Sequence, residues 1–474
     1  MQDFMIRFVS PRITFGGVAV ENPVPVEVPR GVCAVVGPNG SGKSTVGQVV
    51  AKGRYGFGNR IDYGKPEAKV RMLTFTDIHS LTGIDVTRHD QRLESTANDL
   101  VPTVQEIMGV RTDSGRWREL CDAFALHGAE SKRVNYLSSG ELRKLLVINA
   151  LIERPDILVL DNPYIGLDAA SRSELDRALQ AVVAAGTDIV MLLCDAADVP
   201  GYATSVLRVE SRAVAGIITP REEIEAFRSR PVAQETEINE SDLPPLRPGK
   251  GGFEVAFSIA DGHLRYGGNV IIEGLDWTVR QGERWALTGP NGSGKSLLLS
   301  LVCADHPQAY ANRITLFDRR RGTGESIWEI KDRIGYVCPE MQLYFNSDDP
   351  VVSIVSAGLR NALSLYRRPT PEELGEARKW LGLFGIGHLA ERGFRDLSSG
   401  EQRLVLLART FIRQPELLIL DEPLHGLDAA AKERVRRLTD LLVSRNGITL
   451  IFVSHYDREI PASVSLTKRL SKHT

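Results

Sequence analysis

The chain has no large excess of charge of either sign and no long apolar run. Its 58 Lys and Arg balance 60 Asp and Glu, a net charge of −2, so the composition gives no electrostatic case for nucleic-acid binding. No apolar stretch approaches the ~18–20 residues that a membrane-spanning helix needs. The N-terminal segment MQDFMIRFVSPR has no signal-peptide core. The sequence predicts a cytoplasmic protein, for which a role at a membrane would require a partner.

Cysteine is also scarce. The odd number and irregular spacing of the cysteines predict neither a disulfide framework nor a zinc site, so we expect all of them to be packing residues. The 474-residue chain is long enough for two or three domains, and its 42% hydrophobic composition is ordinary for a globular protein. The five cysteines are Cys33, Cys121, Cys194, Cys303 and Cys338.

The chain contains three sequence motifs that each occur twice, in the same order and at similar spacing. Such self-similarity predicts two homologous domains. The motifs are GPNGSGKS (37–44 and 289–296), LSSGE (137–141 and 397–401), and the pair ILVLDNPYIGLD (157–168) and LLILDEPLHGLD (417–428).

The join between the two domains is predicted from composition. Residues 219–251 are poor in apolar residues and rich in Glu, Pro and Gly, which indicates an exposed linker with one short helix near Arg221–Arg228. We therefore expect a first domain at 1–218 and a second at 252–474.

Each half has the pattern of an α/β domain. Continuous apolar runs predict central parallel strands that are covered on both faces. Helices are expected at STVGQVVAKG and SLLLSLVCAD. The sequence thus predicts a mostly parallel sheet flanked by helices in each half. The expected strands are GVCAVVG, DILVLD and DIVMLLC in the first half, and FEVAFSIADGHLRYGG, RWALTG, ELLILD and ITLIFVSH in the second.

The pattern G-x-x-x-x-G-K-S between a strand and a helix is typical of a phosphate-binding P-loop. Its glycines let backbone N–H groups approach the phosphates, and the helix N-terminus adds partial positive charge. We expect Lys43 and Lys295 to reach the β- and γ-phosphates, and Ser44 and Ser296 to offer a hydroxyl to Mg²⁺. The predicted loops comprise Gly37, Pro38, Asn39, Gly40, Ser41, Gly42, Lys43, Ser44 and Thr45, and Gly289, Pro290, Asn291, Gly292, Ser293, Gly294, Lys295, Ser296 and Leu297.

Asp161 and Asp421 each end an apolar strand, at the sheet edge where ligands bind, and are the expected second contacts to Mg²⁺. The next residue should polarise the attacking water. Glu422 can accept a proton there, whereas Asn162 cannot. Asn162 is either drift at an unimportant position or the mark of a lost catalytic site, and other changes in the same half favour the second interpretation.

The P-loop, LSSGE, and a strand ending in Asp-Glu-Pro and GLD, in this order, resemble the ATP-binding cassette (ABC) ATPase family over nearly the whole chain. The resemblance implies two tandem P-loop NTPase domains, a helical signature subdomain in each, ATP as substrate and Mg²⁺ as cofactor. The family's signature is usually LSGGQ. Here Ser139 and Ser399 replace a glycine, and Glu141 and Glu401 replace glutamine, which are mild changes.

In this family two cassettes pair head to tail, with each ATP between the P-loop of one and the signature of the other. The resemblance therefore implies intramolecular pairing of the two halves. Site two would combine Lys295, Ser296, Asp421, Glu422 and His455 with Ser138, Ser139, Gly140 and Asp168. Site one would combine Lys43, Ser44, Asp161 and Asn162 with Ser398, Ser399, Gly400 and Asp428.

His455 follows the strand ITLIFVS and is similar to the family's switch histidine, which touches the γ-phosphate. Gapless pairing of the halves places Cys194 opposite His455, and a slip of one residue would place Asp195 there. Neither side chain replaces an imidazole. We expect Glu422 and His455 to be catalytic, and site one, marked by Asn162 and Cys194, to bind ATP but hydrolyse it poorly.

Two further features bear on nucleotide binding and coupling. Tyr266 and Phe15 precede their P-loops at the distance expected of an aromatic that stacks on adenine, although core packing is the alternative for Phe15. The family's glutamine after the next strand is missing, which weakens the case for ordinary transporter coupling. In its place stand Pro339 or Glu340, with Gln342 slightly late, and in the first half Thr76 or Asp77.

Residues 305–337 resemble a branch of tandem cassettes associated with molybdate transport. That resemblance implies an ATPase that energises a transporter through a membrane permease subunit outside this chain, on the cytoplasmic face of the inner membrane. Molybdate rests on the resemblance alone. The alternatives are an ABC ATPase acting on nucleic acid or ribosomes, which the acidic linker disfavours, and a slowly hydrolysing ATP-gated scaffold.

Overall fold

In the computed structural model the chain forms two compact units, Met1–Ala233 with Gly426–Ala429 and Gln234–His425 with Ala430–Thr474. The structure describes residues 3–52, 60–74, 102–134, 137, 139–230, 238–247, 249, 251–266, 269–303, 307–324, 326–345, 347–360 and 368–471.

The first unit is built on an eight-stranded sheet with the order β2-β3-β11-β10-β5-β9-β8-β7. Its run from β10 to β7 is parallel throughout. A small antiparallel sheet, β4-β1-β6, accompanies it. The strands are β1 (Phe4–Phe8), β2 (Arg12–Phe15), β3 (Val18–Glu21), β4 (Val26–Pro29), β5 (Val32–Val36), β6 (Ile61–Tyr63), β7 (Val70–Leu73), β8 (Ile157–Asp161), β9 (Asp188–Leu193), β10 (Ser205–Glu210) and β11 (Ala213–Ile218).

The second unit repeats this core. Its parallel sheet has the order β17-β18-β19-β14-β20, which matches β7-β8-β9-β5-β10 strand for strand. An antiparallel sheet of order β13-β12-β15-β16 lies beside it. The strands are β12 (Val255–Tyr266), β13 (Asn269–Arg280), β14 (Arg284–Thr288), β15 (Arg313–Leu316), β16 (Arg319–Arg320), β17 (Ile334–Val337), β18 (Leu417–Asp421), β19 (Thr449–Val453) and β20 (Leu466–Arg469).

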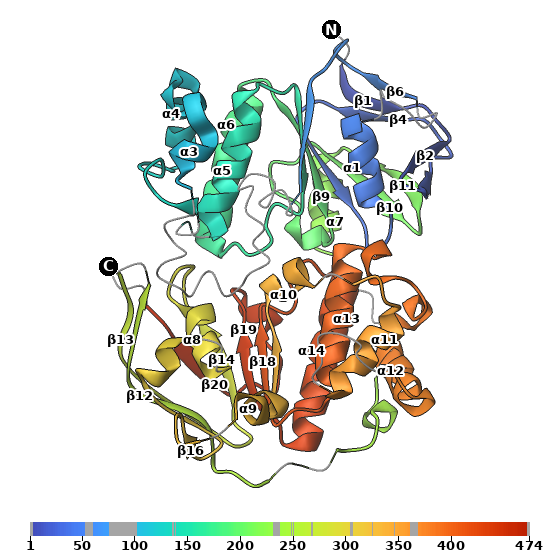
Figure 1. The fold of residues 1–474 in the computed structure, drawn as a ribbon. Helices are drawn as coiled ribbons and strands as arrows, with labels where there is room; N and C mark the ends of the chain where they lie inside the picture. The colour runs from blue at the N-terminus through green and yellow to red at the C-terminus, as the bar shows by residue number, and fades with distance from the viewer. Residues whose placement is uncertain are drawn as a thin grey trace. The chain divides into compact units, whose positions relative to one another are not determined.

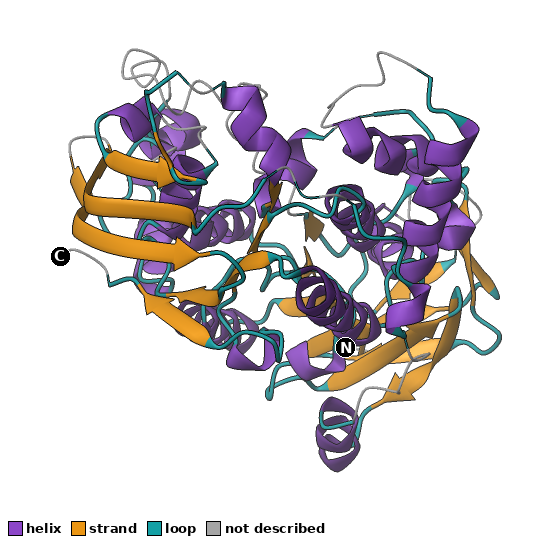
Figure 2. Ribbon diagram, turned by 90° about the horizontal axis from the view of Figure 1, so that it is seen from below, coloured by secondary structure: helices purple, strands orange, loops and turns teal. Residues whose placement is uncertain are grey.

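Helices pack beside the sheets in both units (Figure 2). Figure 1 shows α3, α4 and α5 grouped on one side of the first unit, and α11, α12 and α13 on one side of the second. The predicted α/β fold is confirmed. The helices are α1 (Lys43–Lys52), α3 (Val104–Met108), α4 (Gly115–Ala123), α5 (Ser139–Ile152), α6 (Ala169–Ala184), α7 (Arg221–Arg228), α8 (Lys295–Val302), α9 (Ile327–Arg333), α10 (Pro339–Tyr344), α11 (Val351–Ala357), α12 (Pro371–Leu383), α13 (Ser399–Phe411) and α14 (Ala429–Asn446).

Strand β5 is apolar along its whole length because both of its faces are covered. In β5, Val32 and Ala34 belong to one buried cluster, while Cys33 and Val35 belong to another. This alternation is what a strand between two cores requires. All five cysteines are free thiols, and four of them are buried while Cys194 is half-buried.

The predicted linker is not exposed throughout. Helix α7 forms where the sequence indicates a short helix, and its Ile224 and Phe227 are buried in the core of the first unit. Further along, the Arg445 guanidinium donates to the carbonyl oxygens of Leu243 and Pro244, at 3.2 and 3.0 Å. Apolar residues spaced three apart on α7 are therefore packing residues of the first unit. Within the described ranges, every helix is too short or too polar to cross a bilayer.

Candidate functional site

Each Gly-rich loop closes around its own lysine. Lys43 begins α1 and Lys295 begins α8, and both are buried. Each ammonium group donates to two loop carbonyls and so lies in the loop where phosphates are predicted to bind. The acceptors are Gly37 and Pro38, at 2.6 and 2.7 Å, and Gly289 and Pro290, at 2.8 and 3.0 Å.

Glycine is required at the turn into each helix. The φ angles of Gly42 and Gly294 are 101° and 88°, a region that other residues rarely adopt. A Cβ atom would lie 2.4 Å from Val20 Cγ2 at Gly42 and 2.7 Å from Ile271 Cγ2 at Gly294. Asn39, Gly40, Asn291 and Gly292 lie in the turn between strand and helix, whereas Thr45 and Leu297 lie in the first turn of α1 and α8.

Two loop hydroxyls support a phosphate ligand. Among the described residues, the buried hydroxyls of Ser41 and Ser293 have no hydrogen-bond partner. A buried polar group without a partner is costly, and an anion bound in the loop would supply an acceptor.

A serine and an aspartate meet beside each loop. Ser296 Oγ donates to Asp421 Oδ2 at 2.9 Å, and Ser44 Oγ donates to Asp161 Oδ2 at 3.3 Å. Hydroxyl and carboxylate oxygens are hard donors of the kind Mg²⁺ prefers, so both pairs fit this ion. Burial raises the pKa of Asp161, although Lys43, Ser44 and Asn162 act in the opposite direction.

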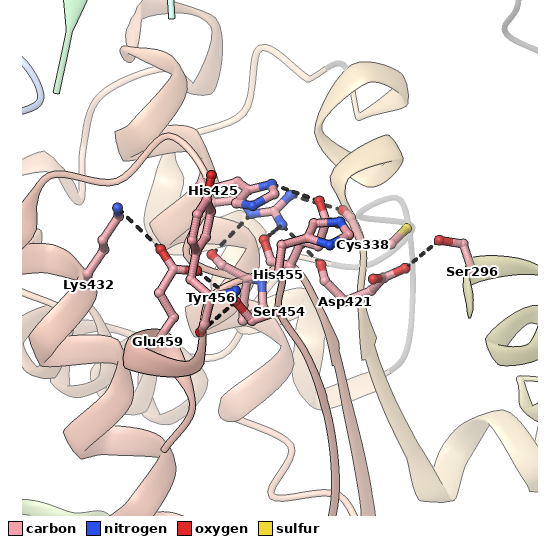
Figure 3. Close-up of polar contacts among 12 residues, drawn as sticks. Ser296, Cys338, Asp421, His425, Lys432, Ser454, His455, Tyr456 and Glu459 are labelled. Carbon is pink, nitrogen blue, oxygen red and sulfur yellow. Dashed lines mark hydrogen bonds and ion pairs between the residues drawn. The ribbon is translucent and has the colours of Figure 1, made fainter. Parts of the chain in front are cut away.

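Glu422 lies between two imidazoles. Its Oε1 is 2.6 Å from His455 Nε2, and its Oε2 is 2.7 Å from His425 Nδ1. The two rings are stacked, with centroids 6.4 Å apart and planes 21° from parallel (Figure 3). Burial opposes the charge of Glu422, but His425 and His455 outweigh it and hold the pKa of that carboxyl well below its ordinary value. The two imidazoles therefore favour the ionised form of Glu422, which is the form that a general base requires.

Hydrogen bonds and an ion pair hold the loop that carries His455. Ser454 Oγ donates to Glu459 Oε2 at 2.9 Å and accepts from the Tyr456 N–H at 3.1 Å. Lys432 Nζ lies 3.3 Å from the other oxygen of Glu459. These contacts, drawn in Figure 3, set the position from which the imidazole reaches Glu422.

In the first unit an amide and a thiol stand where the second unit has Glu422 and His455. Asn162 Nδ2 donates to Asp161 Oδ1 at 2.9 Å, and its Oδ1 is 3.3 Å from Cys194 Sγ. Burial raises the pKa of the Cys194 thiol to about 11, so the thiol is neutral. Ile165 stands three residues after Asn162, where His425 follows Glu422.

Strand register decides between the two candidates for the counterpart of His455. Asp161 pairs with Leu192, and Asp421 pairs with Val453. Two residues further along are Cys194 and His455, so these two positions correspond. Asp195 instead accepts a hydrogen bond from the Ala197 N–H at 3.0 Å.

The signature serine of the second unit caps a helix. Ser398 precedes α13, where it and Glu401 form a capping box, the Ser398 N–H donating to Glu401 Oε2 at 2.7 Å. Glutamate in place of the usual glutamine thus keeps the reciprocal bond. Ser399 begins α13 and Ser139 begins α5, each followed by a glycine, Gly400 or Gly140. Ser138 lies outside the described residues.

The other predicted site residues lie at the ends of helices and strands. Asp168 caps α6 by accepting from the Ser171 N–H at 2.8 Å, and Asp428 directly precedes α14. Phe15 ends β2, half-buried against the core, with Lys52 Nζ 5.6 Å from its ring centre. This position is compatible with stacking on adenine and with core packing, the two alternatives for Phe15. Tyr266 ends β12, and its side chain is outside the description.

Gln342, which follows the expected glutamine position by a few residues, is hydrogen-bonded away from Ser296 and Asp421. Pro339 is the first residue of α10, and Gln342 Nε2 donates to the Ser399 carbonyl at 2.6 Å. Gln342 is thus engaged by the signature helix of its own cassette. Glu340 lies in the same helix, and Thr76 and Asp77 lie outside the described residues.

Sequence reasoning missed two functional features. A buried arginine after each signature binds the backbone of the strand end: Arg403 donates to the carbonyl of Glu422 at 2.7 Å, and Arg143 donates to that of Asn162 at 3.1 Å. The repeat of E-x-R after LSSG was the available signal. His425 was also missed, although its replacement by Ile165 is visible when the two motifs are aligned.

Comparison with known proteins gives one family for both halves. The ABC transporter family matches residues 22–165 and 272–425. The chain is 33% identical over 445 residues to the ABC transporter ATP-binding protein ModF of Escherichia coli (strain K12), covering 91% of this chain and 89% of that protein. It is 30% identical to an uncharacterized ABC transporter ATP-binding protein of Schizosaccharomyces pombe, covering 72% and 69%.

Solved structures show the same fold at low identity. One is the archaeal ribosome recycling factor aABCE1 in complex with the ribosomal stalk protein aP1, with a TM-score of 0.56, 18% identity, and coverage of 97% of this chain and 86% of that chain. Another is an RNase-L inhibitor, with a TM-score of 0.51, 20% identity, and coverage of 91% and 82%. At these identities the likeness concerns the fold alone.

Proposed function

Since the chain belongs to the ABC transporter family and carries two of its ATP-binding cassettes, we propose that its second cassette hydrolyses ATP while its first mainly binds it. One observation carries this proposal. Glu422 is an ionised carboxylate flanked by His425 and His455, whereas the side chain of Asn162, in the corresponding place, contacts Asp161 and Cys194.

In the second cassette the roles follow from the chemistry of each group. Lys295 binds the β- and γ-phosphates together with the loop N–H groups. Ser296 and Asp421 would hold Mg²⁺, which would offset the charge of the phosphates. Glu422 accepts the proton of the attacking water, and Arg403 fixes the backbone that carries it. His455 supplies an imidazole that can turn from Glu422 to the γ-phosphate, as the family resemblance implies.

The first cassette keeps its binding groups. Lys43, Ser44 and Asp161 are arranged as in the second. An amide at Asn162 is not basic, so water bound there lacks a proton acceptor. Nucleotide bound at this site should outlast many turnovers at the other. Each site would be completed by head-to-tail pairing of the two cassettes: Ser398, Ser399, Gly400 and Asp428 for site one, and Ser138, Ser139, Gly140 and Asp168 for site two.

The biological role we propose is to energise a transporter through a permease subunit, at the cytoplasmic face of the inner membrane. The likeness to the ABC transporter ATP-binding protein ModF, which covers 89% of that protein, supports a role with a transporter. Molybdate as the solute is proposed only from the resemblance of residues 305–337. Gln342 donates to the Ser399 carbonyl rather than facing Ser296 and Asp421. We therefore propose that coupling to a permease differs from the usual arrangement.

A genetic test separates this role from its alternatives. Molybdate uptake is measured in cells that carry the wild-type chain, no chain, or Glu422→Gln. Energised transport predicts that uptake falls in both altered strains. Unchanged uptake, together with salt-sensitive binding of the purified chain to nucleic acid or ribosomes, would favour the soluble alternative. Unchanged uptake without such binding would favour an ATP-gated scaffold.

A further inference from the structure

Glu422 is held by two histidines, and the second of them has no assigned role. We propose that His425 is a positioning residue for ATP hydrolysis, which holds Glu422 Oε2 so that Oε1 is presented to the attacking water. This inference rests on the proposed function of the second cassette.

The two imidazoles bind different oxygens of one carboxylate. His425 Nδ1 lies 2.7 Å from Oε2, and His455 Nε2 lies 2.6 Å from Oε1. An oxygen that keeps a close imidazole has less capacity to accept a water proton than one whose imidazole has turned away. The histidine that leaves therefore decides which oxygen becomes the better acceptor.

The two histidines differ in how they are attached. His425 follows Glu422 by three residues in one turn, which is closed by a hydrogen bond from the His425 N–H to the Glu422 carbonyl at 3.3 Å. His455 comes from the separate loop after β19. His425 thus moves with Glu422, whereas His455 can leave. When His455 turns to a nucleotide, Oε1 becomes free while Oε2 stays bound.

The fold itself does not need a histidine at this position. In the first cassette the same turn is closed by the Ile165 N–H and the Asn162 carbonyl, at 3.4 Å. Isoleucine fills the place of His425 there, and an amide fills that of Glu422. A histidine therefore occurs beside the carboxylate, and an apolar side chain occurs where no carboxylate needs to be oriented.

Burial makes the contact count. The side chains of His425 and Glu422 are 9% and 11% exposed, so water competes little for their hydrogen-bonding groups. Glu422 has left-handed backbone, with φ of 49°, which fixes where its side chain starts but not how the carboxylate is rotated. The His425 contact supplies that second constraint. Holding the carboxylate in one orientation should increase the rate of ATP hydrolysis, because misorientation of a base by a fraction of an ångström slows proton transfer.

The test uses three variants of the full chain: His425→Ile, which copies the first cassette, His425→Asn, and His425→Gln. The amide of Asn can replace Nδ1, whereas that of Gln reaches the position of the other ring nitrogen. We expect kcat for ATP to fall about 10- to 100-fold in His425→Ile with KM nearly unchanged, because the lost contact orients the base rather than the nucleotide. His425→Asn should recover most of kcat, and His425→Gln should not.

A double-mutant cycle identifies the group through which His425 acts. In a Glu422→Gln background, His425→Ile should cause no further loss, because there is no base left to orient. An unchanged kcat in His425→Ile, an equal loss in both backgrounds, or a rise in KM alone would overturn the inference. If His425→Ile does not fold, the comparison of the Asn and Gln variants decides, and equal activities would overturn it. If Glu422→Gln itself leaves hydrolysis intact, the proposed function fails instead.

Discussion

Asn162 and Glu422 have the same backbone conformation. Both have φ of 49°, and the N–H of each donates to the carbonyl of the neighbouring strand at 3.0 Å, on Leu192 and Val453 respectively. Asparagine adopts this left-handed region more readily than glutamate, so the strained choice stands in the second cassette. Strain of this kind is typically kept where a reaction depends on it. The two cassettes thus differ at this point in side chain and not in backbone.

The first prediction concerns the proposed base. Glu422→Gln should reduce steady-state ATP hydrolysis by about two to four powers of ten, because a positioned general base is removed while the shape is kept. Binding of ATP should persist, since Lys295 and Ser296 are untouched. Steady-state phosphate release and equilibrium nucleotide binding measure the two effects. Asn162→Ala is the matched control and should change the rate little. Equal damage by both substitutions would contradict the asymmetric assignment.

A second prediction concerns repair of the first cassette, measured in a Glu422→Gln background so that the second is silent. Asn162→Glu alone should raise hydrolysis less than about twofold, because the new carboxylate faces Asp161 and the described part of the chain places no imidazole beside it. Adding Ile165→His and Cys194→His should raise the rate about tenfold further, since these supply both holders of the base. Full recovery from Asn162→Glu alone would show that the histidines are dispensable.

The third prediction concerns pH and the half-buried thiol. Because the thiolate is the reactive form and burial raises the pKa of Cys194 to about 11, alkylation should be slow at neutral pH and rise as pH approaches that value. Labelling with iodoacetamide, followed by mass spectrometry across pH, measures this. The unfolded chain is the control and should react with the pH profile of an ordinary cysteine. Rapid labelling of folded Cys194 at neutral pH would contradict the structure of site one.

Much of the core could be predicted because its signals are local. A short apolar run ending in Asp421 favours a covered strand, and a Gly-rich turn before Lys295 places that lysine at the start of a helix. The roles of His425 and Arg403 could not be predicted in this way. Each depends on a side-chain direction across a turn or between elements, which residue type and spacing do not reveal.

The burial of residues in the predicted linker could not be predicted from the sequence. Low apolar content in residues 219–251 indicated an exposed linker with one short helix near Arg221–Arg228, and α7 lies at those residues. It did not reveal that Ile224 and Phe227 are buried, because two apolar residues give little sequence signal beside many charged neighbours. Gln342 is a similar case: its lateness in the sequence was visible, but its hydrogen bond to the Ser399 carbonyl is a tertiary contact.

The fourth prediction concerns assembly. Because both composite sites are proposed to form within one chain, ATP should close the two cassettes at an effective concentration of ~mM set by the linker. Small-angle scattering of Glu422→Gln with ATP and Mg²⁺ should show a more compact particle of unchanged mass, independent of protein concentration. Lys43→Ala combined with Lys295→Ala is the control and should remain open. A dimer of chains that appears with ATP would count against intramolecular pairing.

The central claim is a division of labour between the two sites, and a nucleotide chase tests it most directly. The chain is loaded with labelled ATP, freed of excess, and chased with unlabelled ATP and Mg²⁺. The account predicts two populations: one that is cleaved and exchanged quickly, lost in Lys295→Ala, and one that stays uncleaved for many turnovers, lost in Lys43→Ala. Two nucleotides that are hydrolysed and exchanged at one common rate would contradict it.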